Sequence, residues 1–514
     1  MRGILVLVLL FAWAPIAHAS SGFAFGAERG PHAVGVSVVH QYDFVRAYRG
    51  GADPVTGELT TGERARPIQT VVWYPAIAGG DPLRFKDYLR LSATEEVFDR
   101  TEAEIAEAAG QLISVRTVGL SPEMAWVQVE RPMWAVRDAA PAAGRFPVVI
   151  YAPSFGAPAY ENADLCEYLA SLGYVVIASP SMGQRTRGMT DDQAGLEAQA
   201  GDIGFLIAYA RSLPQADTDR LAVAGFSWGG LSNIFAAAKD IRIDALISLD
   251  GSVRYFPKLI EDAGYVTPAR VTAPFLLLAA RPMPLEDTPP DMPNRSSSFI
   301  NRMVYADVHR VTMSQMDHGH FAAWQIALSP DAAFTDYSRD EVSASYHWAV
   351  RYAARFLDAH LKDDAEARAF LARSPMENGV PAHLMSVNTR MASGSPPTRE
   401  SMAAQLARRG FAAIPEVHAE FLARDAAFQI SEPDLNTWGY QLLALDRVDD
   451  AISVFKLMTS LHPASGNAFD SLGEAYAIKG ERDLAILNYR KSLVLDPSNA
   501  NGLARLAALG VTVP

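Results

Sequence analysis

The sequence predicts an α/β fold, a mostly parallel β-sheet with helices on both faces, followed by a small all-α repeat domain. Three observations predict it. Short apolar runs alternate with helical patterns over residues 146–316, which is typical of a parallel sheet. One of these runs ends in a glycine-bracketed serine turn at residues 225–229. Beyond residue 430, small and aromatic residues recur with a period of 34.

Each strand is predicted from a short apolar run. In chain order the predicted strands are 33–39, 68–74, 146–151, 174–178, 221–224, 243–249, 273–279 and 311–316. Helical patterns separate them at 92–116, 163–173, 194–213 and 231–238. Right-handed crossovers between parallel strands bring their carboxyl ends to one edge, where ligands bind. We therefore expect functional residues just after these strands.

The first nineteen residues have the pattern of a secretory signal peptide. Arg2 is followed by the apolar run Ile4 to Trp13, which is too short to span a bilayer. Ala17-His18-Ala19 fits a cleavage site, so we expect the mature chain to begin at Ser20. The sequence therefore predicts an exported protein, periplasmic or secreted, with an uncleaved membrane anchor as the alternative.

Length and composition suggest three parts after the signal peptide: an α/β domain over 20–375, a linker with short helices over 376–430, and repeats over 431–514. The net charge of −13 argues against nucleic acid as a partner. The single cysteine, Cys166, excludes an intrachain disulfide. It lies in a helical pattern and is expected to be a core residue rather than a nucleophile.

The serine turn resembles the nucleophile elbow of α/β-hydrolases, G-x-S-x-G, here Gly225, Ser227 and Gly229. A strained turn lifts the serine hydroxyl clear of the sheet. The glycines let strand and helix pass closely. The alternative is a glycine-rich loop with a solvent-exposed serine.

A serine nucleophile needs a base, and the base needs an orienting acid. Asp250 directly follows the strand after the elbow helix and is the preferred acid. Glu286 and Asp287, one strand later, are the alternatives. Asp250 could also be only a turn residue before Gly251.

Two histidines, His318 and His320, follow the last predicted strand. A lone histidine is more often structural, but two here, after a serine and an acid in the right order, indicate a base. His318 is nearer the strand, and His320 is the alternative base, or it lines the pocket or holds the loop. For the oxyanion, the backbone N–H groups of Trp228 and Phe155 are the expected donors.

These residues resemble the α/β-hydrolase branch that contains the plasma-type platelet-activating factor acetylhydrolases, with dienelactone-hydrolase-like proteins beside it. The likeness covers roughly residues 30–361. It rests on the spacing of Asp250 behind Ser227, the glycine-containing loop 154–157, and the H-x-x-F pattern from His318, which favours His318 over His320. Phe155 stands where the family commonly has histidine.

The resemblance implies hydrolysis of a small-molecule or lipid-like ester, with no cofactor and no metal. The residues predict a serine esterase in which His318 moves the proton and Asp250 orients His318. An amidase or peptidase could use the same groups. A scaffold that has lost activity and binds a partner through its repeats is the alternative from another class.

The C-terminal part contains an internal repeat. Residues 376–397 read as a linker and 401–428 as two short helical patterns. Residues of the first repeat recur 34 positions later, in the pairs Gly439 and Gly473, Ala451 and Ala485, Phe455 and Tyr489, and Pro463 and Pro497. This is the tetratricopeptide period, with a capping helix expected at 501–509. The unit is either a structural cap or a surface for a protein partner or self-association.

Overall fold

A computed structural model describes residues 22–49, 62–282 and 298–512 of the chain. The predicted signal peptide and the alternative acids Glu286 and Asp287 lie outside these ranges. The chain divides into two compact units, Met1–Gly394 and Ser395–Pro514. Within the described ranges, none of the helices has both the length and the apolar character needed to cross a bilayer.

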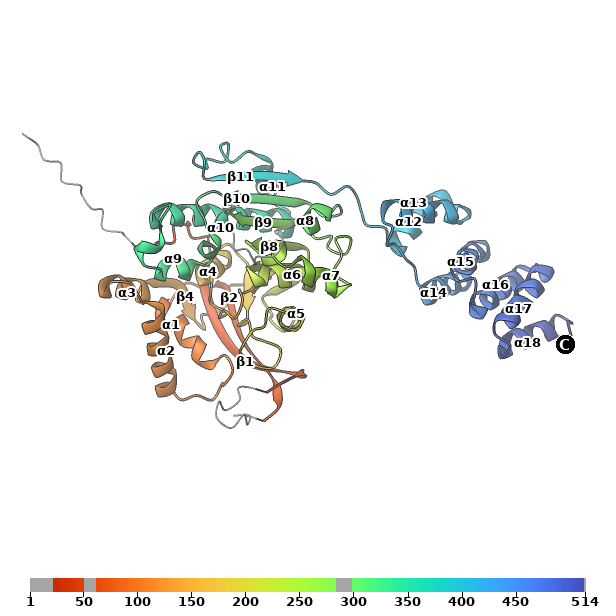
Figure 1. The fold of residues 1–514 in the computed structure, drawn as a ribbon, viewed down its shortest axis with the longest axis horizontal. Helices are drawn as coiled ribbons and strands as arrows, with labels where there is room; N and C mark the ends of the chain where they lie inside the picture. The colour runs from red at the N-terminus through yellow and green to blue at the C-terminus, as the bar shows by residue number, and fades with distance from the viewer. Residues whose placement is uncertain (1–21, 50–61, 283–297, 513–514) are drawn as a thin grey trace, which may run out of the picture. The chain divides into compact units, whose positions relative to one another are not determined.

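The first unit is built on one mixed sheet (Figure 1), which has eleven strands within the described ranges. Its order is β11-β10-β9-β8-β7-β5-β6-β2-β1-β4-β3. The six central strands, β5 to β10, pair in parallel. The bounds are β1 Ala33–Tyr48, β2 Arg64–Ala76, β3 Pro82–Arg84, β4 Pro132–Arg137, β5 Phe146–Ala152, β6 Val175–Ala178, β7 Ala216–Phe226, β8 Ala245–Leu249, β9 Phe275–Ala280, β10 Val308–Met313 and β11 Met385–Arg390.

Helices cover both faces of this sheet, which confirms the predicted α/β fold. On β5, Val149 and Tyr151 belong to a core shared with α4 and α10, whereas Val148 and Ile150 belong to a core shared with α5 and α6. The helices of this unit are α1 Phe85–Leu89, α2 Glu102–Arg116, α3 Pro122–Val129, α4 Ala163–Ser171, α5 Gln193–Ala210, α6 Trp228–Lys239, α7 Pro257–Ala263, α8 Ser298–Arg302, α9 Ala323–Leu328, α10 Arg339–Leu361 and α11 Ala365–Ala372.

The helix predicted over 92–116 is interrupted. A 3₁₀ turn ends at Thr94, and α2 begins only at Glu102. The reason is a new helix start at Thr101, whose side chain accepts the N–H of Glu104, while the Glu104 carboxylate accepts the N–H of Thr101.

The linker predicted at 376–397 is wrong where β11 forms. Met385–Arg390 pairs antiparallel with β10, and the boundary between the two units follows at Gly394. Without β11 the outer edge of β10 would present unpaired N–H and C=O groups. Pairing satisfies those groups, which explains why a polar segment without long apolar runs still forms a strand.

The second unit is all-helical and has one apolar core. Helices α12 Arg399–Arg409 and α13 Ile414–Arg424 contribute Met402 and Phe421 to it, so 395–430 belongs with the repeats rather than with a linker. The remaining helices are α14 Glu432–Ala444, α15 Val448–Leu461, α16 Gly466–Lys479, α17 Arg482–Leu495 and α18 Ala500–Ala508.

The 34-residue repeat is visible in the packing of these helices. Helices α16 and α17 begin 34 residues after α14 and α15. A Cβ atom on Gly439 would lie 2.3 Å from the ring of Phe455, and one on Gly473 would lie 3.0 Å from the ring of Tyr489. In both helix pairs, a glycine at the equivalent position therefore makes room for an aromatic ring of the following helix. Assignment of these pairs to the tetratricopeptide class stays a prediction.

Candidate active site

Ser227 stands alone between β7 and α6. Its backbone has φ 54° and ψ −113°, a strained conformation for a residue with a side chain. Hydrogen bonds fix this turn on both sides. The N–H of Ser227 donates to the Leu249 carbonyl (3.0 Å), and its own carbonyl accepts the N–H groups of Gly230 (3.0 Å) and Ser252 (2.8 Å). The hydroxyl is thereby held above the carboxyl end of the sheet.

The two glycines of the motif are required by close backbone approach. A Cβ atom on Gly225 would lie 2.3 Å from the carbonyl of Gly229. One on Gly229 would lie 2.0 Å from the carbonyl oxygen of Ala152 on β5. Real Cβ atoms do not come so near backbone atoms, so neither position accepts a side chain while β7 and α6 keep this geometry.

Three side chains from distant parts of the chain meet at this edge. His318, in the loop after β10, places Nε2 2.9 Å from Ser227 Oγ and Nδ1 2.6 Å from Asp250 Oδ2. Asp250 directly follows β8, which lies beside β7. The order of the contacts is that of a nucleophile, a base and an orienting acid. The structure thus brings together Ser227, His318 and Asp250.

Asp250 is fully buried and well supplied with donors. Its Oδ1 accepts the N–H of Ala280 (2.9 Å) and an N–H of Arg254 (2.8 Å). Burial alone would raise the pKa of Asp250, but the hydrogen bond and charge of His318, the charge of Arg254 and the Ala280 N–H outweigh it, so the pKa lies below its usual range. The acid therefore stays ionised at neutral pH and can orient the imidazole of His318.

The imidazole of His318 is accessible from solvent. Its side chain is 47% exposed, and it packs against the ring of Phe226 at 5.1 Å and that of Tyr255 at 6.4 Å, both between centroids. One side of the base is therefore positioned by aromatic rings. The other side is open to a substrate or a water molecule.

His320 has a different environment. Its Nδ1 accepts the N–H of Asp317 at 2.9 Å, and its ring stacks on Phe334 at 5.5 Å. Burial, with Arg281 adding to it and Asp317 opposing it, lowers the pKa of His320. The geometry therefore gives His320 the alternative role of holding the loop, and it gives the contact with the serine to His318.

The two expected oxyanion donors lie on neighbouring segments. Trp228 is the first residue of α6, and an N–H at this position has no partner within its own helix. Phe155 lies in a turn closed by the hydrogen bond from the Ala157 N–H to the Ser154 carbonyl (3.1 Å), with Gly156 at φ 65°. The Phe155 ring packs edge-on against Trp228 at 5.5 Å, so this turn lies beside the elbow.

Sequence reasoning missed two charged residues of this region. Arg254 forms an ion pair with Asp250, four positions earlier in the chain. That spacing was a usable signal, because residues this close around one turn can meet. Glu161 lies buried beneath the loop that carries Phe155 and accepts the N–H of Ser154 at 2.8 Å. Nothing in the sequence distinguishes it from a surface glutamate.

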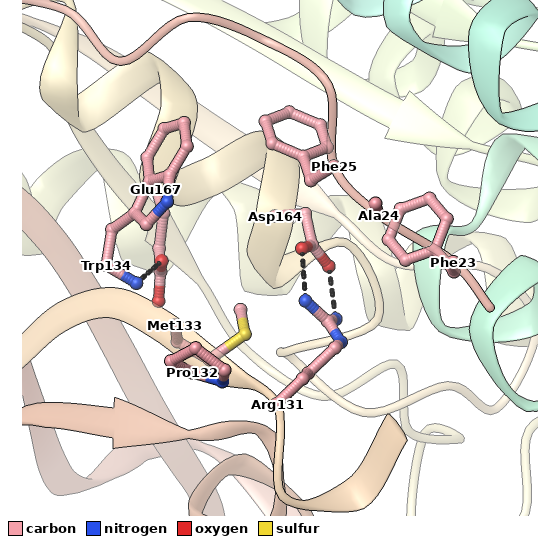
Figure 2. A pocket seen from close by; sticks show the side chains of 9 residues that line it. All are labelled: Phe23, Ala24, Phe25, Arg131, Pro132, Met133, Trp134, Asp164 and Glu167. Atoms are coloured by element: carbon pink, nitrogen blue, oxygen red, sulfur yellow. Dashed lines mark hydrogen bonds and ion pairs between the residues drawn. The ribbon is translucent and has the colours of Figure 1, made fainter. Parts of the chain in front are cut away.

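A separate hollow of about 230 Å³ lies between the N-terminal segment, β4 and α4 (Figure 2). Arg131 binds both oxygens of Asp164 there, at 2.7 and 2.8 Å. Glu167 accepts the N–H of Trp134 (2.6 Å) and the hydroxyl of Tyr88 (2.7 Å). None of the three residues of the serine site lines it. Its charged groups bind α4 to β4 and to Arg131, the residue before β4.

The single cysteine, Cys166, lies away from the serine site on one of the helices of the first unit. Cys166 is buried in α4, and burial raises the pKa of its thiol. A thiol held protonated in the core cannot act as a nucleophile there. Among the described residues, no group of three or more His, Cys, Asp or Glu side chains is arranged to hold a metal ion.

Residues 135–281 match the model of the dienelactone hydrolase family. The first unit has the α/β-hydrolase fold. The matched segment contains Ser227 and Asp250 and ends before His318. A solved structure of a ferulic acid esterase from Streptomyces cinnamoneus is similar at 21% identity, over 72% of this chain and 99% of its own, with a TM-score of 0.48. No curated protein matches this chain.

Proposed function

We propose that this protein is a serine hydrolase that cleaves carboxylic esters of small or lipid-like molecules through an acyl-enzyme. The observation that carries the proposal is the continuous hydrogen-bonded series from Ser227 Oγ through His318 to Asp250. The match to the dienelactone hydrolase family supports it, because a lactone is a cyclic ester. The strained backbone of Ser227 supports it further, because strain of this kind is concentrated at functional sites.

In this mechanism Ser227 Oγ attacks the carbonyl carbon of the ester while His318 Nε2 takes the hydroxyl proton. The N–H groups of Trp228 and Phe155 stabilise the resulting oxyanion. Collapse breaks the bond to the leaving alcohol, which receives the proton from His318. A water molecule then gives a proton to His318 and attacks the acyl carbon. When this second tetrahedral intermediate collapses, the bond between Ser227 Oγ and the acyl carbon breaks and His318 returns the proton to Oγ. The acid is released and Ser227 is restored.

Labelling with a fluorophosphonate tests the nucleophile directly. We expect the wild-type protein to react once per chain, and we expect Ser227→Ala to lose both labelling and several orders of magnitude in kcat on a p-nitrophenyl ester. Ser212→Ala removes an exposed serine of the same fold and should label normally. A wild-type protein that does not label would favour the inactive scaffold.

Esters and amides separate the two enzymatic alternatives. A panel of p-nitrophenyl esters of graded chain length, read against the matching anilides, gives the acyl preference and the ester-to-amide ratio. We expect esters to be cleaved and anilides to be poor substrates. Preference for acetyl over long chains would support the likeness to the platelet-activating factor acetylhydrolases, and efficient anilide cleavage would make the enzyme an amidase or peptidase.

Export and a protein partner are part of the same proposal. The pattern of residues 1–19 supports export to the periplasm or beyond, and N-terminal sequencing of the mature protein should begin at Ser20. The repeated helix pairs support binding of a protein or of a second copy of this chain. Light scattering of the full chain tests self-association.

A further inference from the structure

A buried carboxylate lies directly beneath the loop that carries the second oxyanion donor. Glu161 is 1% exposed. It accepts the backbone N–H of Ser154 at 2.8 Å and the hydroxyl of Tyr151 at 3.2 Å, and the Ser154 hydroxyl donates to its other oxygen. One side chain thus receives both donors of the residue that precedes Phe155. This arrangement fixes the backbone from which the Phe155 N–H projects.

The neighbouring residue anchors the loop on the opposite side of the site. Asn162 donates through Nδ2 to the carbonyl of Phe321 at 2.9 Å, and its Oδ1 accepts the N–H of Ala323 at 2.8 Å. The Phe321 carbonyl and the Ala323 N–H lie just beyond His318 in the chain. Asn162 Nδ2 also donates to the Tyr151 hydroxyl at 2.6 Å. The Tyr151 hydroxyl therefore links Glu161 to Asn162, and through it the oxyanion loop to the histidine loop.

The charge of Glu161 is held mainly by neutral hydrogen-bond donors. The titratable groups that face it are Tyr151 on β5, Cys166 on α4, Tyr346 on α10, and His318. Burial raises the pKa of Glu161 to about 7, although the donors from Ser154 and Tyr151 and the charge of His318 act in the opposite direction. The carboxyl can therefore change its protonation state within the pH range in which such an enzyme works.

We propose that Glu161 is a positioning residue whose ionised carboxylate holds the Ser154–Phe155 turn in the geometry that receives the oxyanion, and that protonation of Glu161 releases this turn. The inference rests on the proposed function, because it assigns a role within that site. A protonated carboxyl offers fewer acceptor sites to the N–H and the hydroxyl of Ser154, which both donate to the carboxylate. Loss of charge therefore weakens the support of Ser154, next to the Phe155 N–H that the transition state needs in a fixed position.

The test is the pH profile of Glu161→Gln with a p-nitrophenyl ester, in the full-length protein. In the wild type, both His318 and Glu161 must be deprotonated, so log(kcat/KM) should fall on the acid side with a slope of about two. In Glu161→Gln only one ionisation remains, and the slope should be about one. At pH 8, kcat should fall about ten- to hundredfold with KM little changed, because the oxyanion contact forms in the transition state.

Glu167→Gln is the matched control. Glu167 lies on α4, six residues after Glu161 in the chain. It is buried to a similar degree and also has its pKa raised to about 7 by burial, but its partners are Tyr88 and Trp134, away from Ser227. Its variant should keep the wild-type slope of about two and the wild-type kcat. If Glu161→Gln behaves as Glu167→Gln does, the positioning role is wrong.

Ser154→Ala keeps the test decisive if Glu161→Gln does not fold. It removes one donor to the ionised carboxylate, which raises the pKa of Glu161 further, so the acid limb of kcat/KM should move to higher pH. An acid limb that does not move overturns the inference. Fluorophosphonate labelling of Ser227 in each variant separates the two proposals, because normal labelling with an unchanged profile leaves the hydrolase standing without the role of Glu161.

Discussion

Two of the three residues at the serine site have a backbone that residues with side chains rarely adopt. Ser227 has φ 54° and Asp250 has φ 40°, and they follow the adjacent parallel strands β7 and β8. Strain of this kind costs on the order of 1–3 kcal/mol for each residue. Each N–H finds a carbonyl on the neighbouring strand, Leu249 at 3.0 Å and Leu278 at 2.6 Å. The sheet thus offsets the strain that presents both side chains to His318.

Asp250→Asn should lower kcat by about 10⁴, because an amide can fix the imidazole in the wrong tautomer and cannot stabilise its protonated form. Asp317→Asn is the control. Asp317 is next to His318 in the chain, but its carboxylate pairs with Arg281 on the surface. An exposed pair is worth at most about 1 kcal/mol, so this variant should lose no more than about fivefold. Steady-state kinetics on one soluble ester would contradict the assignment if the two losses were reversed.

Glu167 should make the stability of the fold depend on pH. Burial raises its pKa from 4.5 to about 7, with Asp164 adding to the rise and Tyr88 and Trp134 opposing it. The folded state therefore binds the proton more tightly than the unfolded state. Its contribution to stability is complete below pH 4.5 and is lost as the pH rises through about 7.

That pKa difference corresponds to about 3 kcal/mol of unfolding free energy. Urea unfolding at pH 5 and at pH 8 measures this effect. The free energy of unfolding of the wild type should fall between the two pH values, and in Glu167→Gln, which has no carboxyl proton to lose, the fall should be smaller by about this amount. Equal declines in the two proteins would show that the carboxyl titrates at its ordinary value in the folded state.

Most of the strands that the sequence predicted are buried on both faces, and β1 is the exception. Strands β5 to β9 have almost continuous apolar runs, as expected for parallel strands under helices. Strands β4 and β11 were not predicted, because near the sheet margins exposed residues alternate with buried ones and the apolar run is broken. Their pairing depends on β1 and β10, which is long-range information that a local pattern does not contain.

At the elbow, Gly229→Ala should be damaging. Its Cβ would lie 2.0 Å from the Ala152 carbonyl oxygen, and overpacking of this kind costs about 1–3 kcal/mol or more. Because the strain falls on the first turn of α6, activity should decrease as well. Gly204→Ala is the matched control, since Gly204 is an exposed residue of α5 with no atom within 4 Å of the added Cβ.

In that control, alanine is a better helix former than glycine, so Gly204→Ala should raise stability by about 0.5–1 kcal/mol. Thermal unfolding of the two variants measures both effects. A Gly229→Ala protein as stable and as active as the wild type would mean that strand and helix do not pass as closely as the structure places them.

At the scale of the whole chain, the serine site could be predicted from the positions of its residues relative to the strands. Ser227 and Asp250 could be predicted because each directly follows a strand, and His318 because it lies in the loop after β10. Parallel strands bring such residues to one edge of the sheet. Arg254 was missed although its four-residue spacing from Asp250 was a usable signal. Glu161 could not be predicted, because its role arises only from the loop that lies above it after folding. The position of the boundary between the units was missed for the same reason, since β11 belongs to a sheet whose other strands precede it.

That boundary gives the last prediction. A chain ending at Gly394 retains β11, every strand of the described sheet and all groups of the serine site, so it should hydrolyse a small soluble ester with the kcat of the full chain. A chain ending at Pro375 loses β11 and the carbonyl of Leu384, which accepts the N–H of Ser314 at 2.9 Å. It therefore exposes the edge of β10, the strand that leads into His318.

The shorter chain should aggregate, or lose about a hundredfold in kcat through displacement of the histidine loop. Kinetics and light scattering on the two truncated proteins and the full chain distinguish the outcomes. Equal activity in both truncated chains would show that β11 is dispensable. A hundredfold loss in the chain ending at Gly394 would show that the helical unit shapes the active site, because that chain lacks nothing else.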